Sequence, residues 1–224
     1  MPTNNQKPPR PADRPPNPRR RQKKTAPPAP NPWDRPPIPP LGDEFPDQIY
    51  RAVGWALSGW EMLEMSLVGL FDILIGTEQD SHASHRAYGA VTIWNIRRDM
   101  LKAAAEAYFW QFPDQALERE ISEMINLADR YAARRNDVAH GIVLAYDEMF
   151  GPPSPLGGFR GWVLFPALTS TKSMRRAFHD PKYALLSEHI TAFGQRFREI
   201  SPRVEELIRS VGKRGASEPN DGSG

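Results

Sequence analysis

Cysteine is absent from this chain of 224 residues. Disulfides and thiolate metal sites are therefore excluded, which fits a reducing cytoplasm. Long apolar runs are missing too: the most apolar stretch, residues 65–76, is too short to span a bilayer and contains Asp72. The first residues are polar and proline-rich, unlike the apolar centre of a signal peptide. We expect a soluble, cytoplasmic protein.

Several catalytic motifs are also missing. Gly157-Gly158 lacks the following Lys-Ser/Thr of a phosphate-binding loop, and no His-Glu-x-x-His zinc pattern occurs. The five histidines are too scattered to argue for a serine triad. His82 and His85 have no ligand-type neighbours at metal spacing, so we interpret them as surface histidines. We expect neither a metal nor another cofactor.

Proline and positive charge are concentrated at the amino-terminal end. Residues 1–40 hold 15 of the 24 prolines, and their nine Lys/Arg and two Asp give a net charge of +7. The other residues, with 20 basic and 25 acidic side chains, sum to −5. We expect residues 1–42 to form a disordered tail, because such a composition cannot form a core. Its basic cluster would contact nucleic-acid phosphates, act as an address signal, or serve only as a solvated tether. The cluster comprises Arg19, Arg20, Arg21, Lys23 and Lys24.

Apolar residues at three-and-four spacing dominate the rest of the chain and predict four main helices. The first begins near residues 45–47 and ends at Gly76, and the second covers about 85–109. The third follows the N-cap Asp114. The fourth follows Asp180-Pro181 and should kink or restart at its Ser-Pro pair, Ser201-Pro202.

The pattern changes after residue 141. Two β-branched and aromatic stretches flank a loop rich in glycine and proline, which predicts a β-hairpin at about residues 142–166. We therefore expect an all-α fold, a four-helix up-down bundle with an appended β-hairpin. The bundle domain should cover residues 43–211, and the polar residues 212–224 should form a disordered C-terminal tail.

Two charged residues fall on the apolar faces of the first two predicted helices. Glu64 lies inside the stripe of the first helix, and Arg97 lies among the apolar residues of the second. An unpaired buried charge costs several kcal/mol, so we expect Glu64 and Arg97 to pair as a polar support in the core. Glu64 could instead reach outward at the margin of its stripe.

The third predicted helix ends in the sequence Arg-Arg-Asn-Asp-Val-Ala-His-Gly. Counted from Leu117 at about 100° per residue, Arg135 rather than Arg134 falls in the middle of the apolar face. Gly141 is a usual helix-ending residue and directly follows His140. The helix thus places an inward guanidinium about a turn and a half from an imidazole at its end.

The pattern Arg135-Asn136-x3-His140 resembles the Arg-x4-6-His signature of the HEPN superfamily. By helix order the resemblance covers roughly residues 46–211, and it is specific at the motif. It implies an α-helical domain of a kind that often acts as a metal-independent ribonuclease in bacterial toxin and phage-defence systems. It also implies a homodimer whose two motifs share a cleft, and an antitoxin or other regulatory partner. In one branch a tyrosine two residues after the histidine accepts nucleotides; this chain has Ile142 there, which argues against that form of control.

The three motif residues suit phosphodiester cleavage. Cleavage needs a base, an acid and positive charge near phosphorus, and in RNA the 2′-hydroxyl is the nucleophile, so no metal is required. His140 would be the general acid/base, because histidine is the residue type whose unperturbed pKa suits proton transfer near neutrality. Arg135 would stabilise charge in the transition state, and Asn136 would orient the substrate or the histidine.

A structural interpretation stays open beside the catalytic one. Arg135 could be the buried partner of Glu64, and His140 could end the helix simply because a basic ring is favoured there. Many HEPN members bind partners without cutting RNA. The alternative function is therefore a noncatalytic HEPN-like module for binding or dimerisation.

Overall fold

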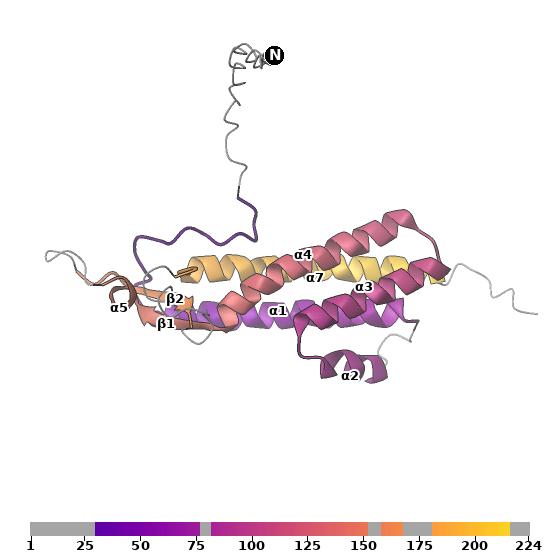
Figure 1. Ribbon diagram of the computed structural model, residues 1–224, viewed down its shortest axis with the longest axis horizontal. Helices are drawn as coiled ribbons and strands as arrows, with labels where there is room; N and C mark the ends of the chain where they lie inside the picture. Colours follow the sequence, from indigo (N-terminus) through magenta and orange to yellow (C-terminus); the bar gives the residue numbers. More distant parts are fainter. Residues whose placement is uncertain (1–29, 77–81, 152–157, 168–180, 216–224) are drawn as a thin grey trace, which may run out of the picture. The chain divides into compact units, whose positions relative to one another are not determined.

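Helices account for most of the residues described by this computed structural model, which are 30–76, 82–151, 158–167 and 181–215 (Figure 1). A two-stranded antiparallel hairpin accompanies them, with Gly141 paired to Pro166 and Ala145 to Trp162. The elements are α1 Pro46–Leu74, α2 His82–Ala90, α3 Trp94–Gln111, α4 Gln115–Ala139, β1 Gly141–Ala145, α5 Tyr146–Phe150, β2 Trp162–Pro166 and α7 Ser187–Gly215. The predicted helical fold with one β-hairpin is thus confirmed.

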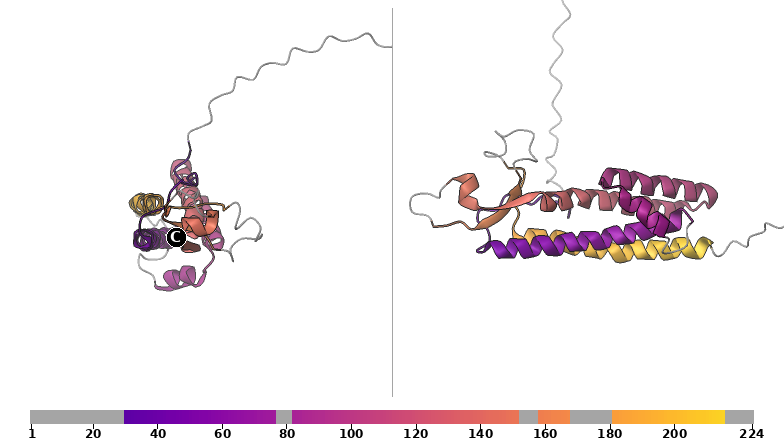
Figure 2. Two further views of the ribbon diagram at one scale, coloured as in Figure 1. Left: turned by 90° about the vertical axis from the view of Figure 1, so that its left-hand side faces the viewer. Right: turned by 90° about the horizontal axis from the view of Figure 1, so that it is seen from below.

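Helices α1 and α7 run side by side in the same direction (Figure 2). The backbone of Gly59 lies against that of Gly194, and fourteen residues further along α7 Gly69 lies against Ile208. A Cβ added at Gly194 would come within 2.6 Å of the Trp55 ring, so this position needs the missing side chain. The pairing is the most extensive between any two elements of the described chain.

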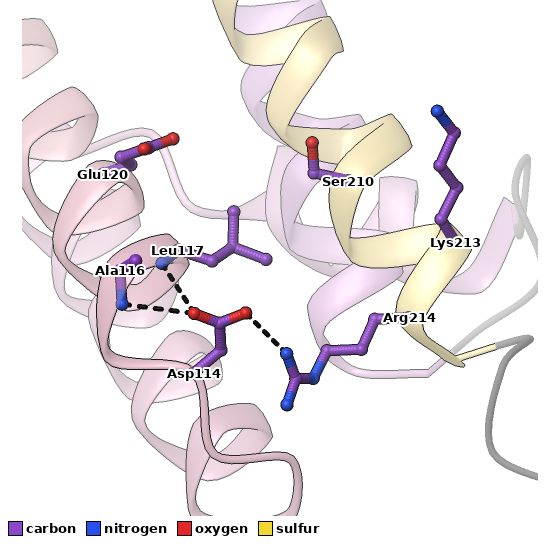
Figure 3. Close-up of a pocket in the computed structure, with 7 residues that line it drawn as sticks. All are labelled: Asp114, Ala116, Leu117, Glu120, Ser210, Lys213 and Arg214. Atoms are coloured by element: carbon purple, nitrogen blue, oxygen red, sulfur yellow. Dashed lines mark hydrogen bonds and ion pairs between the residues drawn. The ribbon is translucent and has the colours of Figure 1, made fainter.

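Helix α4 runs in the opposite direction. Its first turn meets the end of α7 through the ion pair Asp114–Arg214, and its later part meets the beginning of α7 where Tyr131 contacts Phe197. The side chain of Asp114 also accepts hydrogen bonds from the backbone of Ala116 and Leu117, which confirms it as the predicted N-cap (Figure 3).

The expected up-down alternation is wrong, because α3 runs in the same direction as α1. The start of α3 meets the middle of α1 at the ion pair Glu64–Arg97, and near its end Tyr108 donates to the backbone oxygen of Val211 on α7. The predicted second helix is in fact two, α2 and α3, separated by residues 91–93. The β-branched sequence Val-Thr-Ile disfavours a helix there. Helix α2 packs on α1, where Tyr88 meets Phe71, and so brings the chain back along α1 before α3 starts.

The tail was expected to extend to residue 42, but residues 33–43, which we call the strap, are ordered against the helices. The strap packs on the helical unit: the Trp33 ring meets Tyr131 edge-on, and the oxygen of Pro39 accepts a 2.7 Å hydrogen bond from Tyr146. At its end Asp43 binds the backbone and hydroxyl of Ser187 at the start of α7. The basic cluster of the tail lies outside the described residues, as do the last residues of the C-terminal tail.

Helix α7 begins later and continues further than expected. Its first residue is Ser187, preceded by a bridge between Leu185 and Leu164, and it extends past residue 211. Pro202 lies inside the helix rather than ending it. Buried apolar residues continue at helical spacing across Pro202, so packing against α1 outweighs the lost backbone hydrogen bond.

The core is aromatic at its centre. Trp60 is 1% exposed, and its ring meets Trp94 on α3 and Phe197 on α7 edge-on, both at 5.3 Å between ring centroids. These three side chains join α1, α3 and α7, and Phe197 also contacts Tyr131 on α4. Among the described helices, none is long and apolar enough to cross a membrane.

Candidate functional site

A cavity of about 250 Å³ opens where α1, α3 and α4 meet. Its walls contain the three motif residues and the charged pair predicted from the apolar faces, although these come from three helices that are far apart in sequence. The lining residues are Trp60, Glu64, Thr92, Ile93, Trp94, Arg97, Ala132, Arg135, Asn136 and His140. The structure thus brings together all five residues expected for the site and its polar support.

The end of α4 places the motif at this cavity. His140 is the C-cap of the helix, and its backbone N–H donates to the oxygen of Asn136 at 3.1 Å. The backbone oxygen of His140 accepts from Ala167, directly after β2, so the hairpin fixes the point where the helix stops. Asn136 and His140 are both exposed.

Arg135 is half-buried at the wall of the cavity. Its guanidinium donates a 3.2 Å hydrogen bond to Oδ1 of Asn136, while its Nε is buried without a hydrogen-bond partner among the described residues. Within the same described part of the chain it has no ion pair with an acidic side chain. Its positive charge is therefore available to an anionic ligand.

Glu64 and Arg97 do form the ion pair expected from periodicity, at 2.6 Å. Trp60 Nε1 donates to the other Glu64 oxygen at 3.0 Å, and Arg97 Nε donates to the oxygen of Val91 at 2.6 Å. Arg97 therefore also fixes the break between α2 and α3. Because both charges are neutralised within the wall, Arg135 is the guanidinium of the cavity that has no carboxylate partner in the described residues.

The expectation that Arg135, rather than Arg134, points into the interior needs correction. Arg134 is the more buried of the two, at 8% exposure, and forms an ion pair with Asp137 at 3.1 Å. Burial lowers the pKa of the Arg134 guanidinium, and the nearby Asp137 partly offsets this. Arg35 of the strap binds Asp137 on this side of α4. The helical periodicity could not show this, because it considers only the residues of the helix itself.

Three exposed isoleucines lie in or next to the segments that line the cavity, and we call them the apolar rim. Ile93 lines the cavity and is 57% exposed, Ile96 follows one helical turn later at 48% exposure, and Ile142 comes two residues after His140 at 44% exposure. Sequence reasoning missed this rim, because Ile93 and Ile96 lie off the buried face of the predicted helix. Trp94 also lines the site, where its Nε1 donates to Asp129.

Other charged groups lie away from this site. His85, expected at the surface, keeps 39% of its side chain exposed, and its Nε2 lies 3.0 Å from Oδ2 of the buried Asp72, a contact that joins α2 to α1. Within the described ranges no group of three or more His, Cys, Asp or Glu is arranged to hold a metal. A larger cavity of about 470 Å³ lies at the other end of α4 (Figure 3), but its central Asp114 and Arg214 neutralise each other and it contains no motif residue.

Comparisons of the chain with protein-family models, with curated proteins and with solved structures found no match.

Proposed function

We propose that this protein is a metal-independent endoribonuclease of HEPN type with a role in bacterial toxin or phage-defence systems. The observation that carries the proposal is the shared cavity of Arg135, Asn136 and His140, with an exposed imidazole and a guanidinium that no described carboxylate neutralises. A phosphodiester is the anionic substrate that such a pair suits best.

The proposed reaction needs only side chains and RNA. A neutral histidine removes the proton of a 2′-hydroxyl, whose oxygen attacks the adjacent phosphorus. The bond to the 5′-oxygen breaks as a protonated histidine gives its proton to that leaving oxygen. The products are a 2′,3′-cyclic phosphate and a 5′-hydroxyl end. Arg135 would stabilise the charge on the non-bridging oxygens, and Asn136 would hold Arg135 or the substrate in place.

One chain supplies one histidine at the cavity, whereas the reaction uses a base and an acid. A homodimer that joins two cavities would supply both groups. The exposed side chains of Ile93, Ile96 and Ile142 support this arrangement, because they offer apolar contact area beside the polar cavity. The basic cluster of the tail would add nonspecific attraction for RNA, and an antitoxin or other regulator would restrain cleavage.

The decisive experiment is cleavage of a defined single-stranded RNA by the full chain in excess EDTA. We expect cyclic phosphate ends from the wild type and a loss of at least about 100-fold in rate for His140→Ala. His82→Ala is the matched control, because His82 is also exposed but lies on α2 away from the cavity. Absence of cleavage by the wild type, or equal cleavage by His140→Ala, overturns the proposal.

The second candidate is a noncatalytic module for binding or dimerisation, which the apolar rim by itself also favours. In that case Arg135 serves the fold, and Arg135→Ala lowers the melting temperature sharply. An Arg135→Ala variant that remains folded and stable but no longer cleaves RNA separates the two candidates in favour of the nuclease.

A further inference from the structure

The strap holds the end of α4 from the side opposite the cavity. At about 100° per residue, Ala132, Asn136 and His140 follow one line along the helix, and all three line the cavity. On the same count Arg134 lies about 160° and Asp137 about 100° from Asn136, the middle of that line. Their side chains are 10% and 9% exposed, and Asp137 pairs both with Arg134 and with Arg35 of the strap.

Asp137 is the centre of this contact. Arg35 of the strap donates to both of its oxygens, from Nε at 2.9 Å and from a terminal nitrogen at 2.7 Å. Arg134 adds an ion pair one turn earlier on the same helix. Arg35 also lies over the ring of Tyr183, 5.3 Å from the ring centroid. The Tyr183 ring therefore contacts the flat face of the guanidinium, while Asp137 binds its N–H groups.

The position of Asp137 makes these partners necessary. It lies three residues before the C-cap, where a carboxylate faces the negative end of the helix dipole and is disfavoured unless it is paired. Its backbone oxygen is one of the last four of the helix, and Tyr183 satisfies it with a 2.8 Å hydrogen bond. The last turn of α4 therefore depends on groups outside the helix.

The strap is itself anchored at both ends. Trp33 lies between Tyr131 and the guanidinium of Arg130, which is 4.4 Å from its ring centroid. At the other end Asp43 binds Ser187 through two hydrogen bonds of 2.7 and 2.8 Å. Arg35 is thus presented to α4 from a segment that is fixed on either side.

We propose that Arg35 and Asp137 are positioning residues: through the strap they fix the last turn of α4, so that Arg135 and His140 keep their places in the cavity. Neither residue lines the cavity, so they act on it only through the helix. The consequence for RNA cleavage rests on the proposed function, whereas the effect on the helix end does not.

The first test measures the helix end in the full chain without RNA. In Arg35→Gln we expect hydrogen exchange of the amides of residues 137–141 to be about tenfold faster, with residues 120–130 unchanged. The ring signals of His140 in NMR spectra should shift or broaden. Trp33→Ala, which releases the strap at another point, should give the same pattern. Arg203→Gln, at an exposed position of α7, should not.

The second test measures cleavage. Arg35→Gln should lower kcat about tenfold and leave KM for RNA within about twofold, because the substrate does not touch Arg35. Asp137→Asn should act alike, and the double variant should be no worse than either single variant. Arg35→Lys keeps the charge but loses the two-point bond, and should recover part of kcat.

The outcomes separate this inference from the proposed function. If the wild type does not cleave RNA, the nuclease proposal fails. Hydrogen exchange of the amides and the NMR signals of His140 then decide by themselves whether the strap positions the helix end. Unchanged exchange and unchanged His140 signals in both Arg35→Gln and Trp33→Ala overturn the inference. If the wild type cleaves RNA, the inference is also overturned when Arg35→Gln and Asp137→Asn keep the wild-type kcat per folded molecule.

Discussion

The two sides of the last turns of α4 carry similar residues in opposite circumstances. On the strap side, Arg134 and Asp137 are buried and paired, with Arg35 as a third member. On the cavity side, the side-chain partner of Arg135 among the described residues is the amide of Asn136, and His140 is exposed. Neighbouring arginines thus have different roles, because the tertiary contacts on each side differ.

This difference separates charges that the fold itself neutralises from a charge that stays available to a ligand. Groups whose charges are satisfied inside the protein contribute to the folded state and offer little to a ligand. A guanidinium left without a carboxylate contributes less to folding and is free to bind an anion. We therefore expect substitutions on the strap side to lower stability and to reduce activity only through the position of the helix end. Substitutions on the cavity side should lower activity with little loss of stability.

The largest expected effect on stability is at Asp137. Asp137→Ala leaves Arg134 buried without its carboxylate and leaves Arg35 unpaired, so we expect a loss of about 3 kcal/mol in the free energy of unfolding. Chemical denaturation followed by circular dichroism measures it. A loss below about 1 kcal/mol would remove the contrast between the two sides of α4.

Glu64→Gln should come next. It removes the charge that balances Arg97 and weakens the hydrogen bond from Trp60, which we expect to cost about 2 kcal/mol. The matched control is Glu61→Gln on the exposed side of the same helix, where less than about 0.5 kcal/mol is expected. Equal losses at both positions would show that the ion pair in the cavity wall does not support the site.

Arg135→Ala should change stability by less than about 1 kcal/mol, because the side chain gives up only a hydrogen bond to Asn136. The same variant should lose RNA cleavage, as measured under the conditions used for the wild type. A loss of stability as large as that of Asp137→Ala would mean that both sides of the helix are structural, and would favour the noncatalytic module.

The smallest expected effect is a pH dependence of the free energy of unfolding, and it comes from His189 near the start of α7, where the strap ends. Burial lowers the pKa of His189, whose Nδ1 accepts from the backbone of Leu186, although Glu188 and Asp43 oppose the shift. The folded protein therefore keeps His189 neutral at pH values where the unfolded chain already protonates it. Its contribution is complete above its ordinary pKa of about 6.5 and is lost as the pH falls through the lower pKa of the folded state.

His189→Gln tests this directly. The free energy of unfolding of the wild type should fall more steeply between about pH 7 and pH 5 than that of the variant. Parallel curves for the two proteins would show that His189 does not link protonation to the strap end of the fold.

The sequence predicted much of the local structure because its signals are local. Asp114 marks the start of α4, as capping chemistry requires, and α4 ends at Ala139, directly before His140-Gly141. Gly141 does not adopt the positive φ of a helix-ending glycine, and the side chain of Leu164 leaves no room for a Cβ there. The pairing of Glu64 with Arg97 was predictable as well, since two inward charges of opposite sign have few other partners. The roles of Arg135, Asn136 and His140 in cleavage stay predictions.

Other features had no local signal. Periodicity could not show that Arg134 is buried, because the residue that covers it, Arg35, comes from a proline-rich segment about 100 residues earlier. Nor could it show that α1 and α3 run in parallel, since this follows from how the chain returns through α2.

By itself the sequence determined the helical class, the hairpin, the caps of α4 and the residues that can do acid–base chemistry near neutral pH. These follow from side-chain chemistry and from spacing within a single segment. Only the tertiary structure decided which arginine is neutralised and which faces the cavity. The free energy of a charge depends on its partners and its burial, and those come from distant parts of the chain.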